Sequence, residues 1–64
     1  MVKINGEIFN IDGISIEKYL MDYGDDTKRV AVELNGYIVL KSQYGNTYLN
    51  DRDIVEVVSF VGGG

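Results

Sequence analysis

Hydrophobic positions at the start of the chain form two short runs on either side of Asn5-Gly6. An Asn-Gly pair between strand-like runs is the strongest short-range hairpin signal, because both turn residues need a positive φ. The pattern predicts a hairpin over residues 1–12 in which Val2 pairs with Phe9. This register places four apolar side chains on one face. They are Val2, Ile4, Phe9 and Ile11.

The segment SIEKYLMDYG carries the signals of one amphipathic helix. Ser15 is a good N-cap, and Gly24 stands where glycine commonly ends a helix. The apolar side chains between them recur at helical spacing, and they are Ile16, Tyr19, Leu20 and Tyr23. We expect a helix of about two to three turns whose apolar face covers the hairpin.

The second half of the chain repeats the strand signals. Residues 25–29 are predicted to form an exposed link, and VAVELNGYIVL is a second hairpin signal with Asn35-Gly36 at its turn. Alternation places three residues on the core side of this hairpin, namely Val30, Val32 and Leu34. Residues 42–53 have the composition of irregular turns, and residues 54–61 are predicted to form a last strand.

The last strand has apolar side chains on both of its faces, which favours a central position in the sheet. A chain of 64 residues buries about 60% of its unfolded surface, so one helix on one face of a mixed sheet of about four to five strands is the economical solution. With the last strand beside the first, the fold would be an α+β, ubiquitin-like β-grasp. We expect a domain over residues 1–61 and a glycine tail over residues 62–64.

Composition narrows the classes of partner and compartment. With 45% hydrophobic and 25% charged residues, the chain has the composition of an ordinary globular domain. Its net charge of -4 opposes the counterion release that drives nucleic-acid binding, so no nucleic acid is expected as a partner. The sequence has no cysteine and no apolar run of signal-peptide or membrane-helix length. We therefore expect a cytoplasmic protein that contacts no membrane.

Catalytic chemistry is not evident inside the domain. The sequence has no histidine or cysteine, and the three serines, Ser15, Ser42 and Ser59, have no base arranged to activate them. We predict no catalytic residue, and the protein is not expected to be an enzyme.

Two acidic pairs and five tyrosines have structural explanations. Asp25-Asp26 and Asp51-x-Asp53 lack the oxygen count and spacing of a calcium loop, so we interpret them as solvated turns and predict no metal site. The tyrosines are interpreted as core and rim residues, because the acidic charge opposes a nucleic-acid groove.

The chain ends in FVGGG, which has two interpretations. The glycines are either a frayed terminus or a functional tail. Extended glycines span about 3.3 to 3.6 Å each, so three of them carry a terminal carboxylate about 10 Å beyond Val61, through a gap too narrow for a Cβ. A free carboxylate is ionised at neutral pH and is a poor electrophile, so chemistry at the tail requires an activating partner.

Four segments resemble the ubiquitin-like sulfur carriers, and most closely the ThiS family of thiamine biosynthesis. They are INGE, SIEKYL, VAVELNGYIV and DRDIVEVVSFVGGG, and together they span nearly the whole chain. The combination of VAVELNG with a terminal FVGGG is specific. Arg52 departs from the family pattern, which usually has glycine in an Asp-Gly-Asp turn; arginine tolerates a positive φ poorly.

The resemblance implies a protein cosubstrate with no cofactor of its own. An E1-like enzyme would use ATP and magnesium to adenylate the carboxylate of Gly64, reached through a channel that Gly62 and Gly63 occupy. A cysteine desulfurase relay would then supply sulfur to form a thiocarboxylate, which thiazole synthase would accept. The free carrier is expected to be a monomer.

Parity along the last strand predicts a docking patch. Glu56, Val58 and Phe60 share one side and Val55 and Val57 the other, and the charged residue marks the first side as uncovered. Val58 and Phe60 would therefore face a partner. Two alternatives stay open: a β-grasp carrier for molybdopterin synthesis or another thiolation or modification pathway, and a β-grasp binding module whose glycines are incidental.

Overall fold

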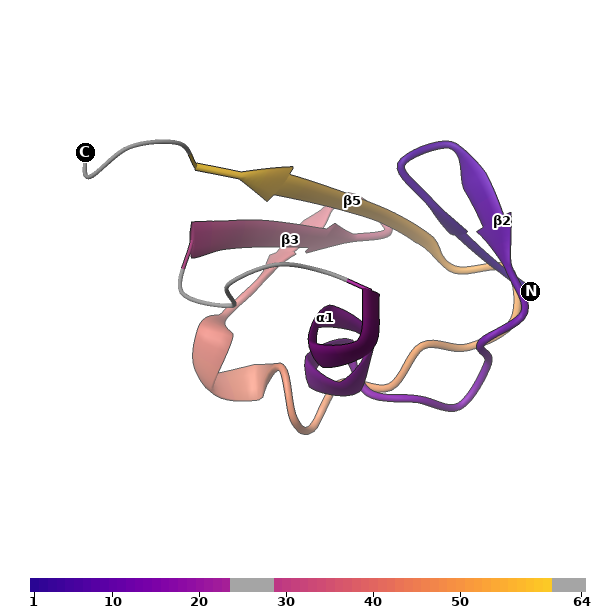
Figure 1. Cartoon of the computed structure of the whole chain (residues 1–64), viewed down its shortest axis with the longest axis horizontal. Coiled ribbons are helices and arrows are strands. Elements are labelled where there is room, and N and C mark those ends of the chain that lie inside the picture. The colour runs from indigo at the N-terminus through magenta and orange to yellow at the C-terminus, as the bar shows by residue number, and fades with distance from the viewer. Residues whose placement is uncertain (24–28, 61–64) are drawn as a thin grey trace.

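A computed structural model of the chain describes residues 1–23 and 29–60. It contains a five-stranded mixed sheet in the order β2-β1-β5-β3-β4, with α1 packed on one face (Figure 1). In chain order the elements are β1 (Val2–Ile4), β2 (Glu7–Phe9), α1 (Ile16–Tyr23), β3 (Val30–Leu34), β4 (Tyr37–Val39), the 3-10 helix η2 (Lys41–Gln43) and β5 (Ile54–Ser59). This is the predicted α+β, ubiquitin-like β-grasp.

The last strand is the central strand of the sheet, as its two-sided apolar pattern predicted. β5 pairs with β1 in parallel and with β3 in an antiparallel ladder that runs from Leu34↔Val55 to Val30↔Ser59. The strand ends at Ser59, two residues short of the predicted limit, and Val61 lies outside the described residues.

Both predicted hairpins form with two-residue Asn-Gly turns. The first has the expected Val2↔Phe9 pair, and the second joins β3 to β4. Asn5 and Asn35 have φ of 50° and 52°, and the glycines that follow them have φ of 85° and 89°. Asparagine and glycine adopt this left-handed region at little cost, so the local sequence sets the register of each hairpin.

The core lies between the sheet and α1. Among the residues that the structure describes, ten side chains are buried in it: Val2, Ile4, Ile16, Tyr19, Leu20, Val30, Val32, Tyr44, Leu49 and Val55. The predicted apolar face of the helix supplies three of them, while Tyr23 is exposed at the rim and stacks on Tyr19 with 5.4 Å between ring centroids. Within residues 1–23 and 29–60, no helix has the length and apolar character needed to cross a bilayer.

Three backbone N–H groups at the start of α1 have no helical partner, and all three are satisfied by other groups. The Lys18 N–H donates to Ser15 Oγ (3.1 Å), which confirms the predicted N-cap. The N–H groups of Ile16 and Glu17 donate to the carbonyls of Thr47 (2.9 Å) and Tyr44 (3.1 Å). The segment after η2 therefore fixes the helix start. Gly24, predicted to end the helix, lies outside the described residues, as do residues 25–28 of the predicted link.

The segment predicted to be irregular contributes two core residues. Tyr44 was expected at the core or rim as one of the five tyrosines, whereas no pattern identified Leu49. Tyr44 and Leu49 are 4% and 1% exposed. The Leu49 carbonyl accepts from the Gly13 N–H (2.7 Å), and the Leu49 N–H donates to the Ile14 carbonyl (2.8 Å). Residues 44–49 thus close the side of the core that the helix leaves open.

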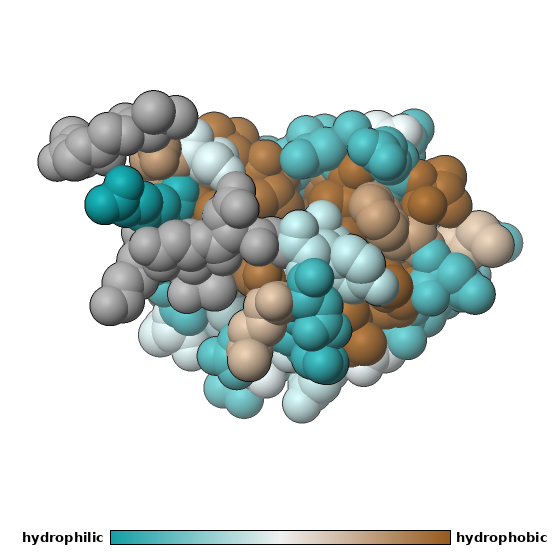
Figure 2. Space-filling model, viewed as in Figure 1, coloured by the Kyte–Doolittle hydropathy of each residue, from teal (hydrophilic) through white to brown (hydrophobic). Residues whose placement is uncertain are grey.

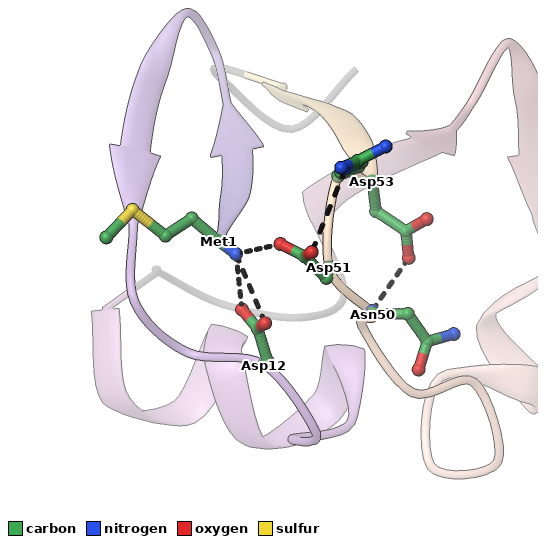
Figure 3. A network of polar contacts seen from close by, with 6 residues as sticks. Met1, Asp12, Asn50, Asp51 and Asp53 are labelled. Carbon is green, nitrogen blue, oxygen red and sulfur yellow. Dashed lines mark hydrogen bonds and ion pairs between the residues drawn. The ribbon is translucent and has the colours of Figure 1, made fainter.

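The turn before β5 is tied to the start of β1 (Figure 3). The Met1 ammonium contacts Asp51 and, at 3.1 Å, Asp12; these hydrogen bonds, to Asp51 first and then Asp12, raise the pKa of the ammonium. The Arg52 N–H donates to the Met1 carbonyl (2.7 Å), and the Asn50 N–H donates to Asp53 Oδ2 (2.8 Å).

Arg52 adopts a φ of 72° in this turn, where the resemblance leads us to expect glycine. Its side chain is 93% exposed and its guanidinium Nε lies 3.9 Å from Asp51 Oδ2. The left-handed conformation costs a non-glycine residue about 1–2 kcal/mol. The structure therefore keeps the turn and holds the arginine in a strained conformation.

Arg52→Gly is expected to stabilise the fold. Relief of the strain exceeds the roughly 0.5–1 kcal/mol of extra backbone entropy that glycine loses on folding, so the net gain is about 0.5–1 kcal/mol. Urea unfolding measures this gain. Arg52→Ala is the control, because it removes the same side chain and keeps the strain. Equal stabilities of the two variants would contradict the prediction.

Candidate functional site

The end of β5 presents apolar side chains on the face of the sheet opposite α1. Val58 and Phe60 are 55% and 54% exposed, Glu56 is also exposed, and Val55 is buried against the helix side. The parity analysis predicted this division. The glycine tail, with Gly62, Gly63 and Gly64, lies outside the described residues.

Neighbouring strands extend this apolar surface. Ala31 of β3 lies opposite Val58, and Glu33 lies opposite Glu56. We define the open face by its large exposed apolar residues, which are Ile8, Ile38, Leu40, Ile54, Val58 and Phe60. Figure 2 shows hydrophobic side chains along the part of the molecule where Figure 1 places β5. Of these residues, the sequence pattern predicted only Val58 and Phe60, although alternation with core residues also marks Ile8, Ile38 and Ile54.

An asparagine side chain extends the pairing of β5 beyond the end of β1. Asn5 Oδ1 accepts from the Val57 N–H (2.8 Å), and Asn5 Nδ2 donates to the Val57 carbonyl (3.2 Å). The Asn5 backbone N–H donates to the Val55 carbonyl (2.9 Å). The amide therefore replaces a strand residue, and it satisfies backbone groups that the three-residue β1 is too short to reach.

The second hairpin holds the start of β5 in a similar way. Asn35 Oδ1 accepts from the Ile54 N–H (2.9 Å), and Asn35 Nδ2 donates to Asp53 Oδ1 (3.0 Å). Both Asn-Gly turns thus clamp the strand that leads to the tail. Sequence reasoning assigned these asparagines to turns alone, because the bonds of their amides depend on a strand about 20 to 50 residues away.

Two aspartates that precede β5 have structural roles. Asp51 pairs with the Met1 ammonium, and Asp53 binds Asn50 and Asn35. Among residues 1–23 and 29–60 no three potential ligand side chains gather as a metal site would require, and Asp25-Asp26 lies outside those residues.

Two tyrosines on the helix side of the sheet have shifted pKa values. Burial raises the pKa of Tyr19, with smaller contributions from Glu7 and Tyr23. Burial also raises the pKa of Tyr44, against a hydrogen bond with the Val32 backbone that lowers it. Both phenols are therefore neutral at physiological pH and act as packing groups.

The open face offers apolar area and backbone groups, and it brings together no acid, base and nucleophile in the arrangement that catalysis needs. Exposed apolar surfaces of this kind are typical of partner-binding sites.

Comparison with known proteins identifies relatives of the chain. The model of the ThiS family matches residues 2–64. A protein of Bacillus subtilis named sulfur carrier protein ThiS is 39% identical over 66 aligned residues that cover all of both chains. A Paramagnetospirillum magneticum protein named thiazole synthase is 45% identical over 62 residues, which are 95% of this chain and 19% of that protein.

A solved structure has the same fold. The crystal structure of the thiamine biosynthesis protein ThiS from Geobacter metallireducens superposes with a TM-score of 0.78 at 27% identity. The match covers 98% of this chain and 97% of that one.

Asn5→Gly is expected to lower the free energy of unfolding by about 1–2 kcal/mol, because it removes both amide hydrogen bonds to Val57 while glycine keeps the positive φ. Chemical denaturation measures the change. Asn10→Gly, at an exposed position outside the strands, controls for the added backbone entropy. An equal loss of unfolding free energy in the two variants would show that the Asn5 amide does not stabilise β5.

Proposed function

Because the chain belongs to the ThiS family, we propose that it is a sulfur carrier in thiamine biosynthesis and that Gly64 bears the carboxylate that is converted. The family match over residues 2–64 carries this proposal, since it includes both the folded domain and the glycine tail. The protein is a cosubstrate, and catalysis belongs to its partners.

The proposed reaction begins when the Gly64 carboxylate attacks the α-phosphorus of ATP on an E1-like enzyme. Pyrophosphate leaves and an acyl adenylate remains. A persulfide sulfur, delivered by a cysteine desulfurase relay, displaces AMP, and a thiol then cleaves the sulfur–sulfur bond to release the thiocarboxylate. Magnesium and ATP are bound by the activating enzyme. This assignment places the reaction in the cytoplasm, where thiols stay reduced.

The tail suits this task because it lacks side chains. In the proposed complex Gly62 and Gly63 would pass through a channel that a Cβ would block, and glycine can adopt conformations closed to other residues. The folded body contributes a fixed starting point, since β3 pairs with β5 as far as Ser59 and the Phe60 N–H donates to the Arg29 carbonyl (2.7 Å).

Thiazole synthase is the acceptor that the comparisons favour. A Paramagnetospirillum magneticum protein of that name contains a segment 45% identical to this chain, so a sequence similar to this chain forms part of a protein named thiazole synthase. This association favours thiamine synthesis over the alternative of molybdopterin synthesis. The E1-like enzyme and the sulfur relay are further partners in the proposal.

We assign Val58 and Phe60 to docking of the activating enzyme. Both are exposed next to the tail, and large exposed apolar side chains of this kind form the energetic centres of interfaces. For an enzyme bound there, the three glycines would reach an ATP site up to roughly 10 Å beyond Val61.

Deletion of Gly64 tests the modified residue. The shortened chain should fold normally and acquire no sulfur, because the last carboxylate no longer reaches the ATP site. Intact-mass analysis after incubation with ATP, the activating enzyme and a sulfur donor measures the exchange of one oxygen for one sulfur. The full-length chain is the positive control, and sulfur on the shortened chain would refute the assignment.

Val58→Asp tests the docking patch. The carboxylate should weaken binding to the activating enzyme about 10-fold or more, because it places a charge in an apolar contact. The free energy of unfolding should change by about 0.5 kcal/mol or less, as at other exposed sites. Met21→Asp introduces the same charge at an exposed position of α1, and this variant should bind the activating enzyme normally. Equal binding by the two variants would remove Val58 from the interface.

A further inference from the structure

The two edges of β5 differ in how far they are paired. On a strand, the N–H and C=O groups of one residue point to one edge, and those of the next residue point to the other edge. The carbonyls of Asp53 and Val55 accept from β1 and its turn, and both polar groups of Val57 bind the Asn5 amide. Ile54 and Phe60 make their hydrogen bonds toward β3 and the residues beside it.

Ser59 is the next residue whose backbone points to the β1 side. Its pair with Val30 belongs to the β3 ladder, but the alternation directs the Ser59 N–H and C=O away from β3. In the described part of the chain, pairing on the β1 side stops at the Asn5 amide and Val57. Figure 1 shows β5 continuing past the β1–β2 hairpin.

We propose that Ser59 is a strand-pairing site, at which an extended backbone segment of the activating enzyme exchanges two hydrogen bonds with the Ser59 N–H and C=O. This inference rests on the proposed function and adds a recognition element to it. An extended backbone is the occupant because it presents one donor and one acceptor at the spacing that an open strand edge offers.

Two features favour a foreign chain over a second copy of this one. Each copy carries a net charge of -4, so two copies repel each other. The Asn5 amide also closes the edge at Val57, so two β5 strands could share few hydrogen bonds among the described residues.

Pairing at Ser59 also accounts for the position of the exposed side chains. A strand added beside β5 places alternate side chains on the open face, next to Val58 and Phe60. The partner would thus hold the end of β5 by its backbone and by its apolar side chains, immediately before the tail.

Ser59→Pro tests the site because it removes the N–H that points to the open edge and leaves the β3 ladder its own donors. The kcat/KM for adenylation should fall about 10-fold or more. Ser59→Ala keeps the N–H and should match the wild type, and thermal melting should find both variants folded. Equal kcat/KM for the two variants would overturn the proposal.

Amide hydrogen exchange of the wild type provides a second measurement that needs no variant. The Ser59 N–H should exchange rapidly in the free protein and become protected in the complex with the activating enzyme. An unprotected Ser59 in that complex would overturn strand pairing. If the wild type binds with Ser59 protected but is not adenylated, the proposed function fails while the pairing site stands.

Discussion

The position of β5 between two hairpins is the constraint on which the rest of the molecule depends. β1 lies parallel to it on one edge, and β3 lies antiparallel to it on the other. The turn residues Asn5 and Asn35 also bind its backbone through their side chains. Removal of this strand would separate the two hairpins into units that are marginally stable alone. The segment that leads to the tail is therefore hydrogen-bonded along both of its edges.

The size of the chain explains why one face of the sheet stays open. A domain of 64 residues has enough apolar material for one layer of core, and α1 with residues 44–49 covers one face of the sheet. The opposite face keeps exposed residues such as Ile38 and Val58 beside the charged pair Glu33 and Glu56. An exposed apolar surface of this kind is free for a partner, and it lies on the strand whose end precedes the glycines.

Local signals predicted most of the fold, and tertiary contacts account for what they missed. The Asn-Gly turns set both hairpin registers because their positive φ is a local property. Leu49 gave no signal, since it lies in a largely polar segment without periodicity, and for the same reason Tyr44 was expected at the core or rim only as one of the five tyrosines. Parity alone predicted the exposure of Val58 and Phe60, whereas the Asn5 clamp requires knowledge of which strand lies beside the turn.

The proposed division between a folded body and a glycine tail would explain how a chain without histidine or cysteine can take part in sulfur chemistry. In the proposed reaction its functional groups are a carboxylate and the backbone, which every sequence possesses, so the side chains need only fix where the tail begins. On one edge of β5 that point is fixed by Val30 of β3 and by Arg29, the residue before β3. The other edge is closed by Asn5 up to Val57 and leaves Ser59 open beyond it, so in our proposal the activating enzyme recognises the carrier immediately before the glycines.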